Sequence, residues 1–189
     1  EGSQAGASLS HTHTQLIATP ITPIQFKQRL VGAEEYYRLK ERCIFCDVIS
    51  EEKQQGKRII YENNAYVAFC PFASCFPFEI QIYPKQHKPD FFSSRDSKRD
   101  LALAIRMVLT KLCSGLNNPP YNFILNTAPN RFARRGYWST LNEDFHWHID
   151  IIPRLTKVAG FEWGSGFYVN PMLPEAAAEF LINVDAGAL

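Results

Sequence analysis

Two histidines near the start of the chain have the spacing and the neighbours of a phosphate-handling site. His11 and His13 are two residues apart, so in an extended segment their side chains point to opposite faces. One imidazole can then be held by a metal or by the protein while the other attacks phosphorus. Gly6 allows a ligand to approach the backbone closely, and Ser8 and Gln15 supply donors for phosphate oxygens. On length alone, the run also fits a histidine-rich surface loop.

The run GASLSHTHTQLIATPITP resembles the active-site strand of the galactose-1-phosphate uridylyltransferase family, within the histidine-triad (HIT) superfamily. That strand usually carries a glycine and a serine, then His-Pro-His, then a glutamine two residues further on. Here Thr12 replaces the proline, and threonine also accepts an extended backbone. The resemblance implies that His13 is the catalytic nucleophile and that His11 binds zinc. The residues that it assigns to the substrate's phosphate are Gly6, Ser8 and Gln15, the last also being catalytic.

In the family this strand closes the first of two related half-domains. The resemblance therefore implies that residues 1–23 end a first half, that residues 24–42 form a connecting helix, and that residues 43–189 are the second half-domain. The Cys-x-x-Cys pair of the first half and much of its nucleotide pocket would then lie upstream of Glu1. We expect the 189 residues alone to be inactive.

A Cys-x-x-Cys pair and three further histidines form a second group with ligand chemistry. Cys43 and Cys46 can face one metal across a tight turn, which is the common half-site for tetrahedral zinc. The redox alternative needs a thioredoxin-like strand and helix, and that pattern is not evident. His87 ends the phrase PKQH, where a plain surface residue is the alternative. His146 and His148 form a second His-x-His in EDFHWHIDIIPRL.

The two His-x-His runs suggest an internal duplication, in which each half contains Cys-x-x-Cys, strands, a helix, a strand and His-x-His. The family resemblance places a metal site in the second half. The implied ligands are Cys43, Cys46, His87 and His146. Four protein ligands close the coordination sphere, so this zinc would be structural. Some members of the family hold iron here through histidines, which makes His148 a further candidate ligand and leaves the metal as zinc or iron.

Hydrophobic patterning predicts the elements that position these residues. We expect a helix before Cys43 that Gly32 is placed to split, and a three-stranded antiparallel meander over residues 57–86, with its turn at Asn63 and Asn64. Apolar residues at helical spacing predict a helix over residues 96–116, capped by Ser94 or Asp96.

The second half of the chain should add a strand in YNFILNTAP, a strand around the second His-x-His, and a closing helix over residues 174–184. In the His-x-His strand, the apolar face carries Phe145, Trp147, Ile149 and Ile151, and the opposite face carries His146, His148 and Asp150. The basic loop between the two strands is a phosphate-binding candidate, although a solvated loop is favoured over it. Its arginines are Arg131, Arg134 and Arg135.

The phrase TKVAGFEWGSGFYVNPMLPEAA mixes glycines with aromatic residues, as loops that cover a ligand or a partner do. It resembles the corresponding loop of bacterial and plant members of the family, which crosses a two-fold dimer interface and contacts the sugar phosphate of the neighbouring subunit. The resemblance therefore implies a homodimer, with Lys157, Phe161 and Glu162 as substrate-binding candidates. An ordinary turn with a core phenylalanine is the alternative.

Composition sets the class of protein. The 189 residues are 46% hydrophobic, which is ordinary for one compact soluble domain, and the net charge of +1 argues against a nucleic-acid partner. No apolar run approaches the ~20 residues of a membrane helix, and no signal peptide opens the sequence. Five cysteines, an odd number, do not indicate a disulfide framework, which favours the cytoplasm.

These observations predict an α+β, HIT-like fold, in which helices pack on an antiparallel sheet. The resemblance implies a ping-pong nucleotidyltransferase with a nucleotidyl-histidine intermediate, acting on a nucleotide sugar and a sugar 1-phosphate, by default UDP-glucose and galactose 1-phosphate. Transfer of an adenylyl group from ADP-glucose to phosphate is the alternative reaction, because GFEWGSGFYVNP is close to the plant-type branch. The third possible function is non-catalytic, with the chain acting as a zinc-stabilised dimerisation fragment. The residues that would recognise the base are expected upstream, so the sequence does not choose between uridine and adenine.

Overall fold

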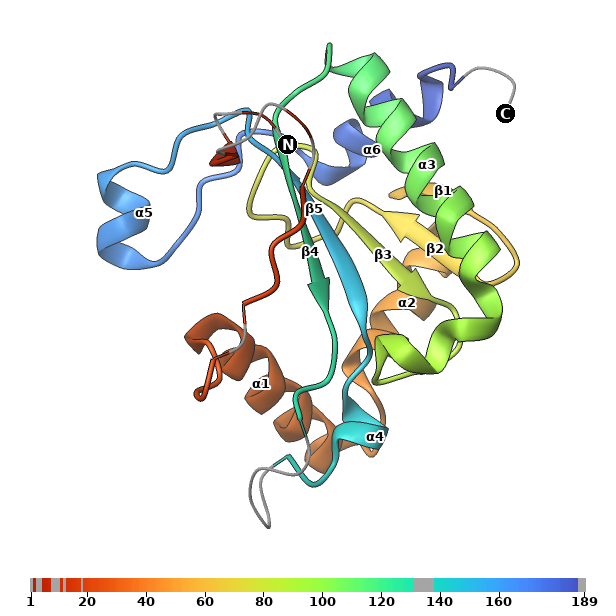
Figure 1. Ribbon diagram of the computed structural model, residues 1–189, viewed down its shortest axis with the longest axis vertical. Helices are drawn as coiled ribbons and strands as arrows, with labels where there is room; N and C mark the ends of the chain where they lie inside the picture. The colour runs from red at the N-terminus through yellow and green to blue at the C-terminus, as the bar shows by residue number, and fades with distance from the viewer. Residues whose placement is uncertain are drawn as a thin grey trace.

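The computed structural model describes residues 2, 5–7, 11, 13–17, 19–130 and 138–186, apart from the side chain of Arg95. Its centre is one antiparallel five-stranded sheet with the strand order β1-β2-β3-β5-β4 (Figure 1). The strands are β1 (Ile59–Glu62), β2 (Tyr66–Phe69), β3 (Ile80–Pro84), β4 (Tyr121–Asn126) and β5 (His148–Pro153). The first three strands form the expected meander, and Asn63 closes its first turn by accepting the backbone N–H groups of Ala65 and Tyr66.

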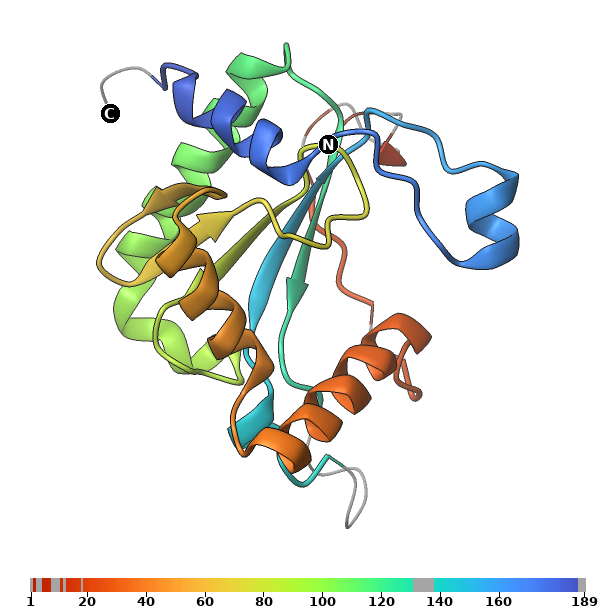
Figure 2. The same cartoon turned by 180° about the vertical axis from the view of Figure 1, so that it is seen from behind.

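Helices cover both faces of this sheet, which confirms the α+β class. They are α1 (Ile24–Lys40), α2 (Ile44–Gln55), the 3-10 helix η2 (Phe91–Ser97), α3 (Lys98–Gly115), α4 (Leu141–Asp144), α5 (Gly160–Ser165) and α6 (Pro174–Asn183). α3 and α6 pack on the face formed by Ile80, Ile82 and Ile149, in the largest buried apolar cluster. α2 packs on the opposite face, where Ile49 meets Val67, Phe69 and Tyr83 (Figure 2).

Three helical features differ from the expectations. α1 runs unbroken through Gly32, because a single exposed glycine lowers helix stability without interrupting the hydrogen bonds. α2 was not expected at all. α3 begins at Lys98 with no side-chain cap, so neither Ser94 nor Asp96 caps it. The Ser94 hydroxyl is used elsewhere, since it accepts a 2.9 Å hydrogen bond from the indole Nε1 of Trp147.

The described residues before α1 belong to no strand, although the sequence predicts an extended active-site strand there. They run along the β4 side of the sheet without joining it, and Gly2 lies against Pro120, directly before β4 (Figures 1 and 2). A strand is defined by pairing with a neighbour, and the pairs of the described strands involve only β1 to β5.

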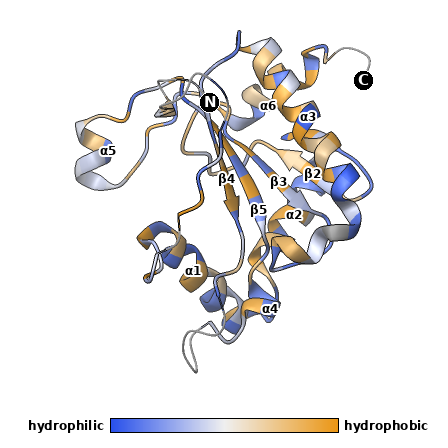
Figure 3. Cartoon of the chain, viewed as in Figure 1, coloured by the Kyte–Doolittle hydropathy of each residue, from blue (hydrophilic) through white to orange (hydrophobic). Residues whose placement is uncertain are grey.

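β4 is an edge strand with apolar side chains on both of its faces. Phe123, Ile124 and Leu125 are successive residues, and each is between 41% and 44% exposed. Figure 3 shows the hydrophobic colour of this strand, next to β5, where hydrophobic and hydrophilic residues alternate. Among the described residues, no helix is both long enough and apolar enough to cross a bilayer.

Candidate functional site

The two cysteines of the Cys-x-x-Cys run meet at the start of α2. Cys43 is the residue directly before the helix and Cys46 lies in its first turn, and the Asp47 N–H donates to the Cys43 carbonyl to open the helix. Three residues of separation therefore bring both sulfurs to one end of α2. A helix N-terminus stabilises negative charge, which suits thiolates.

The two histidines reach the same place from neighbouring strands. His87 follows β3 and His146 precedes β5, and these strands are antiparallel neighbours, so the end of one adjoins the start of the other. One ligand atom from each of Cys43, Cys46, His87 and His146 lies within 4.8 Å of those of the other three. The sequence-predicted metal ligands thus form one cluster, which we call the Cys2His2 cluster.

The distances inside the Cys2His2 cluster suit a tetrahedral metal ion. The Sγ of Cys46 lies 3.2 Å from Nδ1 of His87 and 3.5 Å from Nδ1 of His146. Bonds of zinc to sulfur and nitrogen at tetrahedral angles would separate these atoms by roughly 3.6 Å. The donor set and the spacing therefore fit zinc, and four protein donors leave no position open for a reacting water.

The short helix α4 orients two ligands of the cluster through its backbone carbonyls. The Nε2 of His87 donates to the Asn142 carbonyl at 2.8 Å, and the Cys43 thiol donates to the Asp144 carbonyl at 3.2 Å. A hydrogen bond on the far ring nitrogen fixes the tautomer, so His87 presents a lone pair at Nδ1. Two buried atoms near this point have no hydrogen-bond partner among the described residues, Asp144 Oδ1 and His146 Nε2.

The two thiols have opposite acid–base properties when no metal is bound. The Cys43 thiol hydrogen-bonds to Cys46, which raises the pKa of Cys43 to about 11 and lowers the pKa of Cys46. The thiol of Cys43 is also the main cause of the raised pKa of His87. Of the two thiols, Cys46 loses its proton the more readily, and binding a metal must displace the Cys43 proton.

His148 lies outside the Cys2His2 cluster. Its Nδ1 lies 3.0 Å from the His146 carbonyl and its Nε2 lies 2.9 Å from the guanidinium Nη1 of Arg29. Since the guanidinium is always a donor, Nε2 accepts and Nδ1–H donates. The ring stacks on Tyr83 at 4.8 Å, and burial lowers the pKa of His148 to about 4. Both ring nitrogens are thus engaged by the protein, and this histidine is neutral.

The first His-x-His run repeats this local geometry. Nδ1 of His13 lies 3.2 Å from the carbonyl oxygen of His11, just as Nδ1 of His148 faces the carbonyl of His146. An Nδ1–H donated to that carbonyl leaves the lone pair of His13 on Nε2. The structure does not bring His11 into the Cys2His2 cluster.

The other predicted phosphate contacts are only partly described. Gly6 has φ = +83°, the left-handed backbone that favours glycine, and a side chain there would meet nothing within 4 Å. Gln15 is exposed. Ser8 and Thr12 lie outside the described residues, as do Arg131, Arg134 and Arg135 of the basic loop.

The glycine-rich and aromatic loop forms an arm that contains α5 and stands away from the sheet (Figures 1 and 2). Phe161 is 60% exposed, so it is not a core residue, and Lys157 is exposed as well. The Glu162 carboxylate accepts the Ala159 N–H at 3.0 Å and so opens α5. The arm is attached at Asn170, whose amide donates to the Ser74 hydroxyl at 2.9 Å.

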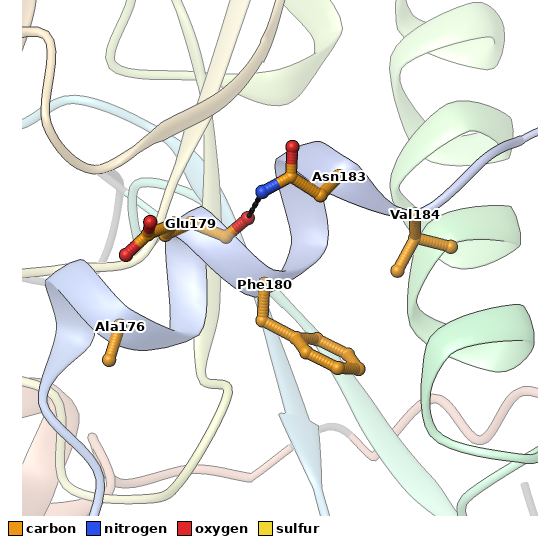
Figure 4. Close-up of a pocket in the computed structure, with 5 residues that line it drawn as sticks. All are labelled: Ala176, Glu179, Phe180, Asn183 and Val184. Atoms are coloured by element: carbon orange, nitrogen blue, oxygen red, sulfur yellow. Dashed lines mark hydrogen bonds between the residues drawn. The ribbon is translucent and has the colours of Figure 1, made fainter.

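A shallow hollow lies at the other end of the molecule, along α6. Figure 4 shows its lining, where the Asn183 amide donates to the Glu179 carbonyl and the Phe180 ring points toward α3. The lining residues are Ala176, Glu179, Phe180, Asn183 and Val184. None of them is a predicted site residue. The only charged residue among the described lining is the acidic Glu179, so this lining offers no positive charge to bind a phosphate.

Sequence patterning did not reveal one polar group of the site region. Arg29 of α1 contacts Asn126 of β4 and both His148 and Asp150 of β5. Gln81 of β3 belongs to the same group, because its side-chain amide donates to Oδ1 of Asp150. The face of β5 that carries His148 and Asp150 is therefore buried, and Arg29 of α1 lies over it.

Comparison with known proteins places this geometry in context. No protein-family model matches the chain. An ADP-glucose phosphorylase from Arabidopsis thaliana is 36% identical over 185 residues, which cover 97% of this chain and 50% of that protein. A galactose-1-phosphate uridylyltransferase from Thermotoga maritima is 30% identical over 193 residues, which cover 95% of this chain and 57% of that protein.

A solved structure shows the same architecture. The crystal structure of an ADP-glucose phosphorylase from Arabidopsis thaliana with bound ADP-glucose matches with a TM-score of 0.86 at 35% identity, covering 98% of this chain and 57% of that one. The chain thus spans about half the length of the curated relatives it matches.

Proposed function

Because the chain is homologous to galactose-1-phosphate uridylyltransferases and ADP-glucose phosphorylases, we propose that it acts in nucleotidyl transfer from a nucleotide sugar, with His13 as the nucleophile. The homology over 97% of the chain carries this proposal. The His13 geometry supports it independently. A histidine with Nδ1–H held by a carbonyl keeps the lone pair of Nε2, which is the state that a nucleophile requires.

The proposed reaction has two displacement steps. Nε2 of His13 attacks the α-phosphorus of the nucleotide sugar, the bond from that phosphorus to the bridging oxygen breaks, and sugar 1-phosphate leaves. The ring becomes cationic when the N–P bond forms, and the hydrogen bond from Nδ1–H to the His11 carbonyl stabilises that charge. A phosphate oxygen of the second substrate then attacks the same phosphorus and releases the histidine. Gly6, Ser8 and Gln15 are proposed contacts of the phosphate oxygens.

Two nucleotide sugars are candidates for the first step. Identity to the ADP-glucose phosphorylase is 36%, against 30% to the uridylyltransferase, so we place ADP-glucose with phosphate as acceptor first. UDP-glucose with galactose 1-phosphate is the second candidate. The chemistry at His13 is the same in both, because the base lies far from the reacting phosphorus.

Labelling separates these candidates and tests the nucleophile. We expect ADP-glucose labelled at the α-phosphorus to leave an acid-labile, base-stable label on His13 in the full-length protein. His13→Asn should abolish the label, and His11→Asn should reduce it, because a displaced nucleophile loses rate steeply. Labelling by UDP-glucose alone would select the uridylyl reaction. A label that persists in the His13 variant would refute the proposed nucleophile.

We propose that the Cys2His2 cluster binds one zinc ion and stabilises the half of the fold around it. Its four donors fit tetrahedral zinc, and iron, the alternative, would more commonly be bound by a site richer in nitrogen and oxygen donors. Cys43 and Cys46 fix the start of α2, while His87 and His146 fix the ends of β3 and β5. The metal would therefore join one helix to two strands of the sheet.

The arm around α5 supports a further proposal, that the protein forms a homodimer. Phe161, Trp163 and Phe167 are between 60% and 79% exposed, and large aromatic side chains concentrated on a projecting arm are typical of an interface. Lys157, Phe161 and Glu162 are proposed to reach the substrate of the other subunit.

A further inference from the structure

A group of buried polar side chains on the sheet surrounds one nitrogen of Arg29. The Nη1 atom lies 2.9 Å from Oδ2 of Asp150, 2.9 Å from Nε2 of His148 and 3.1 Å from Oδ1 of Asn126. The three partners come from β4 and β5, whereas Arg29 comes from α1, 97 to 121 residues away in sequence.

The acceptors of this group are held in place by one another. Oδ2 of Asp150 also accepts from Nδ2 of Asn126 at 3.0 Å, and Oδ1 accepts from Nε2 of Gln81 at 3.0 Å. Asp150 is 1% exposed, and a carboxylate so deeply buried is strongly destabilising unless a cation pairs with it. Within the described part of the chain, the ion pair with the guanidinium of Arg29 at 2.9 Å meets that need.

We propose that Gln81, Asn126, His148 and Asp150 form an internal binding site for a guanidinium group, which we call the guanidinium site. Arg29 fills it and is a positioning residue. By filling the site it fixes α1 on the sheet and takes up the lone pair of His148.

The first consequence concerns α1. Only Leu30 and Ala33 are buried along its 17 residues, so the helix has a small apolar anchor. Leu30 packs on Leu141 and Phe145, at the α4 end of the sheet. The contact of Arg29 with β4 and β5 adds a directional anchor. α1 directly follows the segment that carries His13, so the guanidinium site also sets where that segment leaves the body.

The second consequence concerns the two His-x-His runs. His13 and His148 share the contact from Nδ1 to the carbonyl two residues earlier, and each therefore carries its lone pair on Nε2. In His148 that lone pair accepts from Arg29, and a nitrogen that accepts a charged hydrogen bond is not available to attack phosphorus. We therefore infer that the second His-x-His run has the geometry of the first but cannot act as a nucleophile. This inference rests on the proposed role of His13.

Hydrogen exchange of the purified 189-residue chain tests the site without any nucleotide. In Arg29→Ala we expect the amides of α1 to exchange about tenfold faster or more, because a hydrogen bond to a charged group contributes at least that factor. The amides of α3 should be unchanged. Arg38→Ala is the matched control on the same helix, since the Arg38 side chain is 70% exposed and its ion pair, with Glu34, stays within α1. It should leave the protection of α1 unchanged.

Chemical rescue makes the test specific. The Arg29 side chain is 40% exposed, so the site opens to solvent and a guanidinium ion can enter once the side chain is gone. Tens of millimolar guanidinium chloride, far below the molar range that unfolds proteins, should restore most of the α1 protection in Arg29→Ala. Equal sodium chloride should not. Unchanged exchange in the variant, or no recovery with guanidinium, would overturn the proposal.

A second variant covers the case in which Arg29→Ala does not fold. Arg29→Met keeps the apolar stem and removes the charge, so it should fold and show the same faster exchange and the same rescue. Diethyl pyrocarbonate should also modify His148 faster in this variant, as located by peptide mass spectrometry, and guanidinium should slow that modification. Equal rates in the variant and the wild type would count against the site. Absence of a label on His13 in the wild-type protein, together with the faster exchange and the guanidinium rescue in the variants, would instead contradict the proposed function alone.

Discussion

Cys46 is the residue on which the Cys2His2 cluster depends most, because its sulfur contacts both histidine rings. His87 lies 3.2 Å away and His146 lies 3.5 Å away. Cys43 faces the same point but also donates to the Asp144 carbonyl, so part of its hydrogen bonding is directed at α4. The hydrogen bond from Cys43 lowers the pKa of Cys46, so Cys46 gives up its proton to a metal more readily than Cys43 does.

Cys46→Ser should therefore remove the metal. We expect about one zinc per chain in the wild type and a clear loss in the variant, because a hydroxyl is a poor zinc ligand. Cys113→Ser, in α3 and away from the cluster, should retain the metal. Elemental analysis of both proteins decides the outcome. Equal zinc content in the two variants, or no metal in the wild type, would refute the site.

The same cluster predicts how zinc affinity depends on pH. The pKa of Cys43 is raised to about 11, so its thiol is protonated at neutral pH and must lose that proton to bind zinc. Affinity should rise about tenfold for each pH unit per proton released. Zinc affinity must rise with pH and not fall, since higher pH removes the proton that competes with zinc for the Cys43 sulfur. A competition assay with a coloured chelator across neutral pH measures the slope, and a flat profile would contradict thiolate ligation by Cys43.

At the scale of elements, the contact between α3 and α6 depends on a missing side chain. A Cβ built on Gly115 would lie 2.8 Å from Cγ2 of Val184 and 2.9 Å from Cε1 of Phe180. Lys111, one turn earlier in α3, donates to the Leu181, Ile182 and Val184 carbonyls at the end of α6. The two helices are thus joined by close packing and by a cation at a helix C-terminus.

Gly115→Ala and Gly32→Ala should consequently have opposite effects. Both glycines are helical, and alanine is the better helix former by about 0.5–1 kcal/mol. Gly32 has no neighbour within 4 Å, so Gly32→Ala should stabilise by about that amount. At Gly115 the clash should dominate and lower the free energy of unfolding by about 1–3 kcal/mol. Urea denaturation measures both. Stabilisation by Gly115→Ala would show that α6 is not packed on α3 as described.

Local patterns in the sequence predict much of this arrangement, and long-range contacts account for what they miss. The meander follows from Asn63 and the alternation around Ile80, and the Cys2His2 cluster follows from ligand types at characteristic spacing. α2 was missed because its sequence is mostly polar, and the helix is stabilised by burial of Ile49. Arg29 was missed because an arginine on a charged helix looks solvated, and its partners lie 97 or more residues away.

At the scale of the whole molecule, two of the regions that expose apolar side chains differ in kind. The β4 edge offers Phe123, Ile124 and Leu125, each a little over two-fifths exposed, beside a row of backbone groups. The α5 arm offers Trp163 at 79% and Phe167 at 72%, on a segment whose described hydrogen bonds to the body come mainly from Asn170. An arm with so few attachments and so much aromatic surface suits a contact with another subunit.

The arm therefore predicts self-association through α5. We expect the purified chain to dimerise reversibly, and Trp163→Asp to weaken that association by about tenfold or more, because aromatic residues dominate the binding energy of interfaces. Leu39→Asp is the matched control, since Leu39 is 81% exposed on α1 and lies off the arm. Sedimentation equilibrium over a range of concentrations measures both. A strict monomer, or equal weakening by both variants, would show that the arm is not the interface.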